Sequence, residues 1–467
     1  MSLPSFLSEI RRNLNDPISI SILFSLDLTS RDLASLQNDL VDKGYDIESL
    51  VEQQNYFDGD WYGFTEFVKT YLRFVKEVDP YDLSESYHLF ERVLNDLQVA
   101  YSNSRAHLLS EAVRKIAPSV TAISIDLDLN DRPDGSKMDR TLDVSKILLK
   151  MFNSIRAERS TPMSSTPSKK IIILFIAVLL CKCYFKVNQP MACANVFSNI
   201  HTAHIKFSDY PRAQRVTFRY YLGRFYFLRQ SLTRARFHLQ WAFDNCHALA
   251  TSNLRAILTY LIPTNLLLGV GTTMMLYSIA GPTLEAIFRP LDKALRTGDL
   301  FKYNSQLVQY FEWFKRRKMY VLLKSKGEIL VFRNLLRTVH RVTSQIVDTQ
   351  MKLTGSKGHP TDVTYENMLL GIALSTRTLG NMVHSDIATD HPAVMPYVSG
   401  ELAWDYDDVE NVCISLCNQG FMMGNIFTRS KLVRLRKAGG FRSMKEIREL
   451  HESAAKSGYA EEAWMNT

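Results

Sequence analysis

The chain has little glycine, proline or cysteine. Its 467 residues include 20 glycines, 15 prolines and 6 cysteines. Apolar residues recur mostly at steps of three and four positions, and this period together with sparse glycine and proline predicts helices rather than strands. So few cysteines exclude a disulfide framework and are typical of a reducing compartment such as cytosol or nucleus. We therefore expect most of the cysteines to be buried thiols.

The chain also lacks a long apolar run. The longest, Ile171 to Cys181, is followed by Lys182 and falls short of the roughly 18–20 residues that a membrane-spanning helix needs. The N-terminal sequence MSLPSFLSEIRRNLND has acidic residues and an arginine pair where a secretory signal would have an apolar stretch. We expect an intracellular protein with no membrane association.

Charge of the two signs is unevenly distributed. Residues 1–168 contain 18 Lys and Arg against 26 Asp and Glu, whereas residues 169–467 contain 38 against 22. The first part therefore has a net charge of −8 and the second a net charge of +16. A surplus of this size favours a polyanionic partner, either a nucleic acid or an acidic protein. A solvated basic surface with no such partner is the alternative.

Helix-length segments with short breaks dominate the sequence up to about residue 327. A polar loop is predicted at Asp126 to Gly135, and a Ser/Thr/Pro linker at Glu158 to Lys170. Beyond it, Gly223 allows close approach of a neighbouring helix, and Pro263 is expected to kink or break its own helix. Helices paired in this way form a solenoid. The predicted helices after the linker cover residues 171–187, 191–200, 210–229, 231–246 and 252–268.

The pattern changes after residue 327. Helices are predicted at 328–343, at 364–374 with Thr364 as N-cap, and at 407–420 with Asp407 and Glu410 as a capping box. Two short β-type runs follow, 421–427 and 432–436, with Val433 and Leu435 on one face and Arg434 and Arg436 on the other. Three helices closed by a basic hairpin have the layout of a winged helix.

Patterns that would indicate a metal or a catalytic site are weak. Cys181, Cys183, Cys193, His201 and His204 crowd one region, but their spacing fits no common zinc motif. Buried structural thiols are the stronger interpretation.

A calcium loop and a phosphate loop are also disfavoured. The sequence from Asp126 begins like a calcium loop but has Asp131 where Gly is needed and Lys137 where Glu is needed. Gly269-Val270-Gly271 is a lone GxG without a preceding strand or a following GK[ST], and neither GxSxG nor HExxH occurs. We expect no metal, no cofactor and no catalysis.

Two basic clusters are the main candidates for binding nucleic acid. Residues 315–341 have net charge +8 and residues 429–448 have net charge +7. If both lie on one face of the winged helix, lysine and arginine contacts to phosphates would give sequence-independent, salt-sensitive affinity. Contact with acidic protein partners is the alternative. The predicted nucleic-acid-binding residues are Lys315, Arg316, Arg317, Lys318, Lys324, Lys326, Arg333, Arg337, Arg429, Lys431, Arg434, Arg436 and Lys437.

Aromatic residues at helical spacing precede and overlap the first basic cluster. Core packing is the expected role for most of them, and a groove for a protein partner is the sharper alternative. The candidate partner-binding residues are Phe301, Tyr303, Tyr310, Phe311, Trp313 and Phe314.

Three stretches resemble the PCI domain, which is shared by proteasome lid, signalosome and initiation-factor subunits. They are RYYLGRFYFL at 219–228, the Ala-Phe pair within 241–243, and NLRAILTYLIPTNLLLG at 253–269. Within the family, they are similar to the branch that holds the PCI subunit of the nuclear transcription-coupled mRNA export complex and its signalosome-associated paralogue. FNSIRAERSTPMSSTPSKK, MACANVFSNI and DDVENVCISLCNQGF favour the export subunit.

The resemblance and the periodicity together predict a mostly α fold: a right-handed, TPR-like helical-repeat solenoid followed by a winged-helix subdomain with a small β-hairpin wing. The expected domains are an N-terminal helical region at 1–165, a PCI helical-repeat domain at 166–326, the winged helix at 327–440 and a tail at 441–467.

The resemblance also implies a function. It implies a non-enzymatic subunit of a hetero-oligomer, in the nucleus and at the nuclear pore. Its partners would be a large PCI-containing export scaffold of the germinal-centre-associated type, a small acidic protein of the split-hand/split-foot family, and RNA or DNA bound without sequence preference. A purely structural connector like the signalosome-associated paralogue is the alternative.

Overall fold

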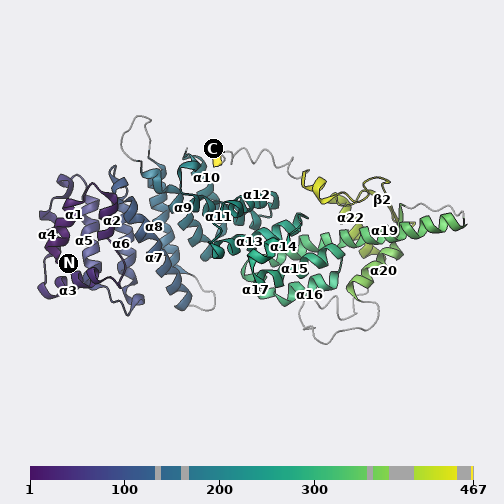
Figure 1. Ribbon diagram of the computed structural model, residues 1–467, viewed down its shortest axis with the longest axis horizontal. Helices are drawn as coiled ribbons and strands as arrows, with labels where there is room; N and C mark the ends of the chain where they lie inside the picture. The colour runs from purple at the N-terminus through teal and green to yellow at the C-terminus, as the bar shows by residue number, and fades with distance from the viewer. Residues whose placement is uncertain are drawn as a thin grey trace. The chain divides into compact units, whose positions relative to one another are not determined.

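The computed structural model of the chain is built mainly of helices (Figure 1). It describes residues 1–131, 138–158, 168–203, 205–354, 361–377, 404–449 and 464–465. The chain forms two compact units, Met1–Tyr221 with Glu461–Thr467, and Leu222–Ala460. No helix in the described ranges is both long enough and apolar enough to cross a membrane. The fold is the mostly α arrangement predicted from the sequence, stacked helices followed by a small C-terminal sheet.

The first unit consists of stacked helices around an aromatic core. Phe24, Phe64, Phe67 and Tyr71 lie in edge-to-face and tilted ring contacts at its centre. Its helices are α1 (Leu3–Arg12), α2 (Pro17–Leu23), α3 (Arg31–Lys43), α4 (Ile47–Gln53), α5 (Tyr62–Glu77), α6 (Leu83–Ala100), α7 (Ser110–Asp131), α8 (Asp139–Arg156), α9 (Ile173–Lys186), α10 (Cys193–His201) and the first part of α11 (Arg212–Leu228).

Two features near the expected first domain boundary differ from what the sequence predicted, namely the loop from Asp126 and the boundary at residue 165. The polar loop predicted from Asp126 is wrong at its start, because α7 continues to Asp131. Asp128 is buried and accepts hydrogen bonds at 2.8 Å from the amide and the hydroxyl of Thr141, which hold the helix end against α8. In addition α8 packs on α9, so the compact units do not divide at residue 165. The rest of the predicted loop and most of the predicted linker lie outside the described residues.

The second unit begins with paired helices. Leu239 of α12 lies over Gly223 of α11, with its Cγ 2.7 Å from where a Cβ would stand, so the predicted close approach is confirmed. Pro263 does not break its helix, because α13 is buried along most of its length and packing holds it together. The helices are α12 (Leu232–Asn245), α13 (Thr251–Leu267), α14 (Met274–Ala280), α15 (Pro282–Thr297), α16 (Leu300–Gln309), α17 (Phe311–Arg316) and α18 (Tyr320–Leu322).

The second unit ends in three helices and a sheet. Thr364 caps α20 as predicted, whereas Asp405 with Asp408, not Asp407 with Glu410, forms the capping box of α22. The predicted hairpin is confirmed, and a third antiparallel strand that the sequence did not suggest gives the order β1-β3-β2. Val363 pairs with Val433 in this sheet. The elements are α19 (Glu328–Thr354), β1 (Asp362–Thr364), α20 (Tyr365–Thr376), α22 (Tyr406–Asn418), β2 (Gly424–Phe427) and β3 (Leu432–Leu435).

Candidate nucleic-acid interface

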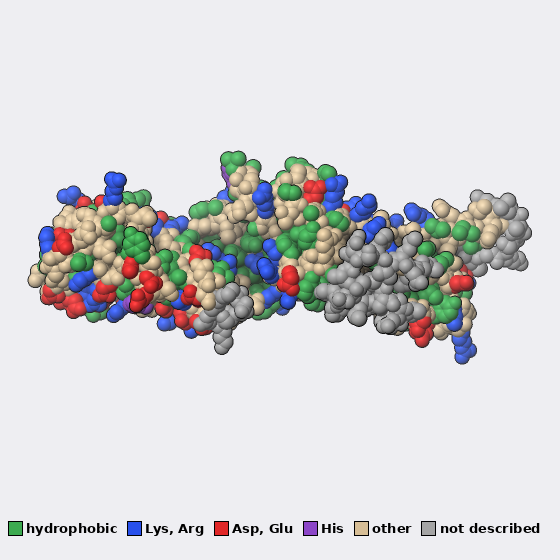
Figure 2. All heavy atoms as spheres, turned by 90° about the horizontal axis from the view of Figure 1, so that it is seen from below, with side chains coloured by type: hydrophobic (Ala, Val, Ile, Leu, Met, Phe, Trp, Pro, Cys, Tyr) green, Lys and Arg blue, Asp and Glu red, His purple; other side chains and the backbone are tan. Residues whose placement is uncertain are grey.

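Acidic side chains are frequent on the first unit. Figure 2 shows many of them over the part formed by α1 to α8. Several are already paired within the unit: Lys69 donates to Glu52 at 2.7 Å and to Glu66 at 2.8 Å, and Arg140 lies 2.5 Å from Asp131. This unit therefore offers a polyanion little attraction.

The basic residues 315–318 lie at the end of α17. Lys315 is exposed and 3.5 Å from Glu312, and Arg316 is exposed. Arg317 stacks on Trp313, with 3.9 Å between its guanidinium carbon and the ring centroid, and donates to the Trp313 carbonyl at 3.2 Å. Lys318 is exposed in a left-handed turn with φ 57°. Two of these four cations are therefore partly engaged within the chain.

The next predicted cations surround the start of α19. Lys324 is engaged, with 2.6 Å to Asn304 Oδ1 and 3.1 Å to Glu328 Oε1. Lys326 is exposed. Arg333 is only 3% exposed and donates to Asn334 Oδ1 at 2.6 Å and to the carbonyl of Arg442. Arg337, one helical turn further, is exposed.

The cations of the wing are exposed, and two of them make internal contacts. Arg434 forms a two-pronged bond to Asp362 at 2.7 and 2.8 Å, and this hydrogen bond raises the pKa of the guanidinium. Lys431 lies 4.1 Å from the centroid of Tyr406. Arg429, Arg436 and Lys437 are exposed without an ion pair to any residue of the described ranges. The sequence could not predict the Arg434 pairing, because β1 was not foreseen.

The basic segments do not all meet. Lys326 and Arg448 line one pocket of about 680 Å³ together with Phe421. Arg333 donates to Arg442, so the segment after the wing crosses the first half of α19. In contrast, Figure 1 shows α17 and β2 at opposite ends of the second unit. Residues 315–318 therefore lie apart from the wing, because α18 and the 27-residue α19 separate them in the chain and in space.

The candidate aromatic residues are divided between core and surface. Tyr303 and Phe314 are buried, with the Tyr303 hydroxyl donating to the carbonyl of Leu323 at 2.9 Å. Their location is that of core residues, as expected for most of the set. Phe301, Tyr310, Phe311 and Trp313 are half-buried. Binding of a partner by any of them stays a prediction.

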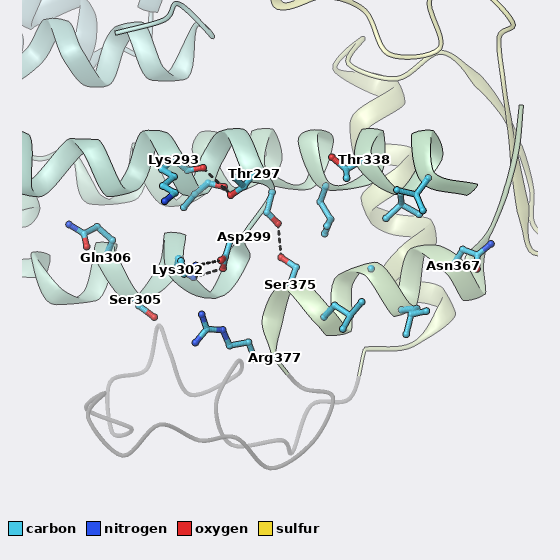
Figure 3. A pocket seen from close by; sticks show the side chains of 18 of the residues that line it. Lys293, Thr297, Asp299, Lys302, Ser305, Gln306, Thr338, Asn367, Ser375 and Arg377 are labelled. Atoms are coloured by element: carbon cyan, nitrogen blue, oxygen red, sulfur yellow. Dashed lines mark hydrogen bonds and ion pairs between the residues drawn. The ribbon is translucent and has the colours of Figure 1, made fainter. Parts of the chain in front are cut away.

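An apolar groove lies in the second unit between α15, α16, α19 and α20 (Figure 3). Its volume is about 860 Å³. Val342, Ile346, Leu370 and Leu374 line it and are each about half exposed or more. Figure 3 shows Lys293 and Arg377 beside the groove, while Asp299 is bonded to Lys302 at 3.2 Å. The groove thus combines an apolar floor with a rim that has a surplus of positive charge.

The described residues of the cysteine-rich region show no metal geometry. Cys181, Cys183 and Cys193 are buried, as predicted, and burial raises the pKa of the Cys183 thiol to about 12. His204 lies outside the described residues. No group of three or more His, Cys, Asp or Glu side chains in the described part of the chain is placed to hold a metal ion.

Comparison with known sequences finds relatives that are PCI proteins. No family model matches the chain. It is 29% identical to a PCI domain-containing protein of Schizosaccharomyces pombe, over 81% of this chain and 80% of that protein. It is 26% identical to the nuclear mRNA export protein THP1 of Saccharomyces cerevisiae, over 89% and 90%. It is 31% identical to a CSN12 homolog of Neurospora crassa, over 44% and 46%. The chain therefore resembles PCI domain-containing proteins, as the sequence motifs indicated.

Proposed function

We propose that this chain, which resembles PCI domain-containing proteins over most of its length, is a non-enzymatic scaffold and nucleic-acid-binding subunit of a nuclear mRNA export complex. The likeness to THP1 supports the export complex and the nuclear location, since that relative is a nuclear mRNA export protein. An association with the nuclear pore is part of the same proposal. The observation that carries the nucleic-acid role is the set of exposed cations in the second unit that have no carboxylate partner among the described residues.

The proposed interface is redrawn from the sequence-based one. It consists of the exposed cations at the start of α19 and on the wing, and it leaves out residues 315–318, which lie at the other end of the unit. Arg434 is a weak contributor because Asp362 already neutralises it. Lysine and arginine contacts to backbone phosphates position a nucleic acid without reading its sequence. The interface residues are Lys326, Arg337, Arg429, Arg436 and Lys437.

Charge reversal tests the RNA-binding role. In the variant K326E/R429E/R436E/K437E, we expect the affinity for a single-stranded RNA to fall at least about 100-fold, because four phosphate contacts become repulsive. The matched control R11E/R31E/R92E/K150E reverses four exposed cations of the first unit. Fluorescence anisotropy at fixed salt measures both. If the two variants lose affinity equally, net charge alone drives binding and the interface is wrong.

The protein-binding role is proposed for the apolar groove. Its rim carries Lys293 and Arg377, so we infer a partner segment with an apolar face and acidic flanks. The large PCI-containing export scaffold and the small acidic split-hand/split-foot protein are the proposed partners of the hetero-oligomer. Leu374→Asp, at a side chain 63% exposed, should abolish co-purification of one of them. Val321→Asp, 73% exposed and outside the groove, should leave co-purification intact.

A structural connector without RNA contact is the second candidate. The match to CSN12 homologs supports this candidate, with 31% identity to the Neurospora crassa protein over 44% of the chain. Affinity purification with identification of the co-purifying subunits distinguishes the two candidates. Export subunits should accompany the chain if the proposal is right, and signalosome subunits if the connector is right.

A further inference from the structure

Three arginines converge on a small pocket of the second unit. The pocket has a volume of about 290 Å³ and lies between the turn that ends α13, one face of α15 and the first half of α19. Arg296 of α15 and both Arg333 and Arg337 of α19 line it, together with Gly269 and Gly271 of the turn. Arg296 was not among the predicted binding residues, and the lone GxG of the turn was too weak a pattern to predict a phosphate site.

The charges in this pocket do not balance. Asp292 is the acidic residue that lines it, and this carboxylate is bonded to Arg296 at 2.8 Å. The C-terminal end of α13 adds partial negative charge, equivalent to about half an elementary charge. One carbonyl of this helix end is already engaged, because the amide of Val270, just after the helix, donates to the carbonyl of Asn265 at 2.8 Å. Arg333 and Arg337 are therefore left without a carboxylate among the described residues.

Arg333 has an unused donor. Its side chain is 3% exposed, and its Nε has no hydrogen-bond partner among the described residues. Burial, and secondarily the charge of Arg337, lower the pKa of Arg333 to about 10. A buried cation beside a second cation is costly unless an anion compensates it. Together with the exposed guanidinium of Arg337 at the rim, the free Nε–H forms an incomplete anion-binding arrangement.

The turn next to these arginines allows a neighbouring side chain to pack closely, because it has a glycine at 269. Gly269 has a φ of 63°, and a Cβ there would stand 2.6 Å from Met444. Met444 therefore packs directly on the turn and forms one wall of the pocket. A Cβ on Gly271 would lie 3.6 Å from Nη2 of Arg296, so this guanidinium is next to the second glycine.

We propose that this pocket binds one backbone phosphate of the RNA strand, held by Arg333 and Arg337 with Arg296 at the rim. Guanidinium groups bind phosphate oxygens through paired, charge-assisted hydrogen bonds. The choice of RNA as the source rests on the proposed function, because Arg337 belongs to the proposed interface. Free phosphate offers the same chemistry, so the experiment separates the two sources.

Inorganic phosphate is the first probe, tested on the full chain by calorimetry. We expect saturable binding of one phosphate, at least about tenfold weaker in Arg337→Gln because a charge-assisted hydrogen bond is lost. Arg341→Gln, an exposed arginine one turn further along α19 and outside the pocket, is the matched control and should bind normally. Variants of Arg333 are avoided because that side chain also holds Arg442. No saturable binding, or equal losses in both variants, would overturn the site.

RNA is the second probe. Arg337→Gln should weaken RNA binding about tenfold and lower the slope of log affinity against log salt by about 0.7, the value for one phosphate contact on a single strand. Unchanged RNA affinity in this variant would overturn RNA as the source. The variant K326E/R429E/R436E/K437E should still bind inorganic phosphate. If it does so while wild-type RNA binding is absent, the proposed function fails and the phosphate pocket stands.

Discussion

The two units differ in how they accommodate a buried cation. Lys69 in the first unit is 5% exposed and touches two carboxylates, those of Glu52 and Glu66. Arg333 in the second unit is 3% exposed and bonds only to an amide oxygen and a carbonyl oxygen among the described residues. Burial lowers the pKa of both groups, but for Lys69 the carboxylates outweigh it and raise the pKa to about 12. For Arg333 the pKa falls to about 10.

The presence or absence of carboxylate partners indicates different roles for the buried charges of Lys69 and Arg333. A buried cation paired with carboxylates stabilises its own fold and has no capacity left for a ligand. A buried cation that keeps an unused donor beside a second cation is destabilising by itself and becomes favourable when an anion arrives. Lys69 therefore serves the structure of the first unit, whereas Arg333 is the kind of buried cation that the proposed phosphate pocket requires.

Removing the carboxylates of the first unit should have the largest effect. In the variant E52Q/E66Q, Lys69 stays buried without an anion, and we expect the free energy of unfolding to fall by about 2 kcal/mol. Hydrogen exchange of the α5 amides measures this locally. The single variant Lys69→Met removes the cation instead. It leaves the carboxylates of Glu52 and Glu66, whose side chains are 65% and 32% exposed and stay hydrated, so it should change the free energy of unfolding by less than about 1 kcal/mol. If Lys69→Met lowers the free energy of unfolding more than E52Q/E66Q does, the two carboxylates do not compensate the buried charge of Lys69.

Much of the fold could be predicted from the sequence, because apolar periodicity and caps are local signals. The helix spacing after residue 169, the Thr364 cap and the hairpin were all visible in this way. The last turn of α7 could not be predicted, since Asp126 to Asp131 looks like a loop in the sequence. In the structure Asp128 accepts a hydrogen bond from the amide of Thr141, which holds this end of the chain segment helical. Strand β1 has only three residues, and its pairing with β3 depends on contacts distant in the sequence.

The candidate site was predicted less completely than the fold. Residue counts identified the basic segments but not their location, and 315–318 proved to lie far from the wing. Counts also could not show that Asp362 neutralises Arg434. Arg296 was missed altogether because it stands alone in the sequence and joins Arg333 and Arg337 only through the packing of α15 on α19.

Relieving the like charges of the second unit should have a smaller effect of opposite sign. Arg333 and Arg337 are four residues apart on α19, and like charges at this spacing are destabilising by roughly 0.2–0.5 kcal/mol. We therefore expect Arg337→Gln to raise the free energy of unfolding by about that amount in phosphate-free buffer, measured by urea unfolding. Saturating phosphate should reverse the order, making the wild type the more stable protein. A variant that is less stable than wild type without phosphate would contradict the account of Arg333.

Two histidines, His107 and His340, should show the same contrast between burial with and without a nearby carboxylate, with the smallest expected effect. Burial lowers the pKa of His340 in the second unit, and no carboxylate in the described ranges opposes this shift. Burial also lowers the pKa of His107 in the first unit, but there Glu158 acts in the opposite direction. Both folded-state pKa values lie below the unfolded value of about 6.5, so folding favours the neutral rings. Each histidine therefore lowers the free energy of unfolding as the pH falls below about 6.5 towards the folded-state pKa. Above about pH 6.5 this loss is absent.

Glu158→Gln separates the two histidines. Without the carboxylate, the pKa of His107 should fall further, and the loss of stability on acidification should extend to lower pH. The pKa of His340 should not change, because Glu158 is not among the groups that act on it. NMR titration of the two imidazole rings measures both values in one sample. An unchanged pKa of His107 would mean that the carboxylate of Glu158 does not act on this imidazole. The contrast between the units would then hold only for Lys69 and Arg333.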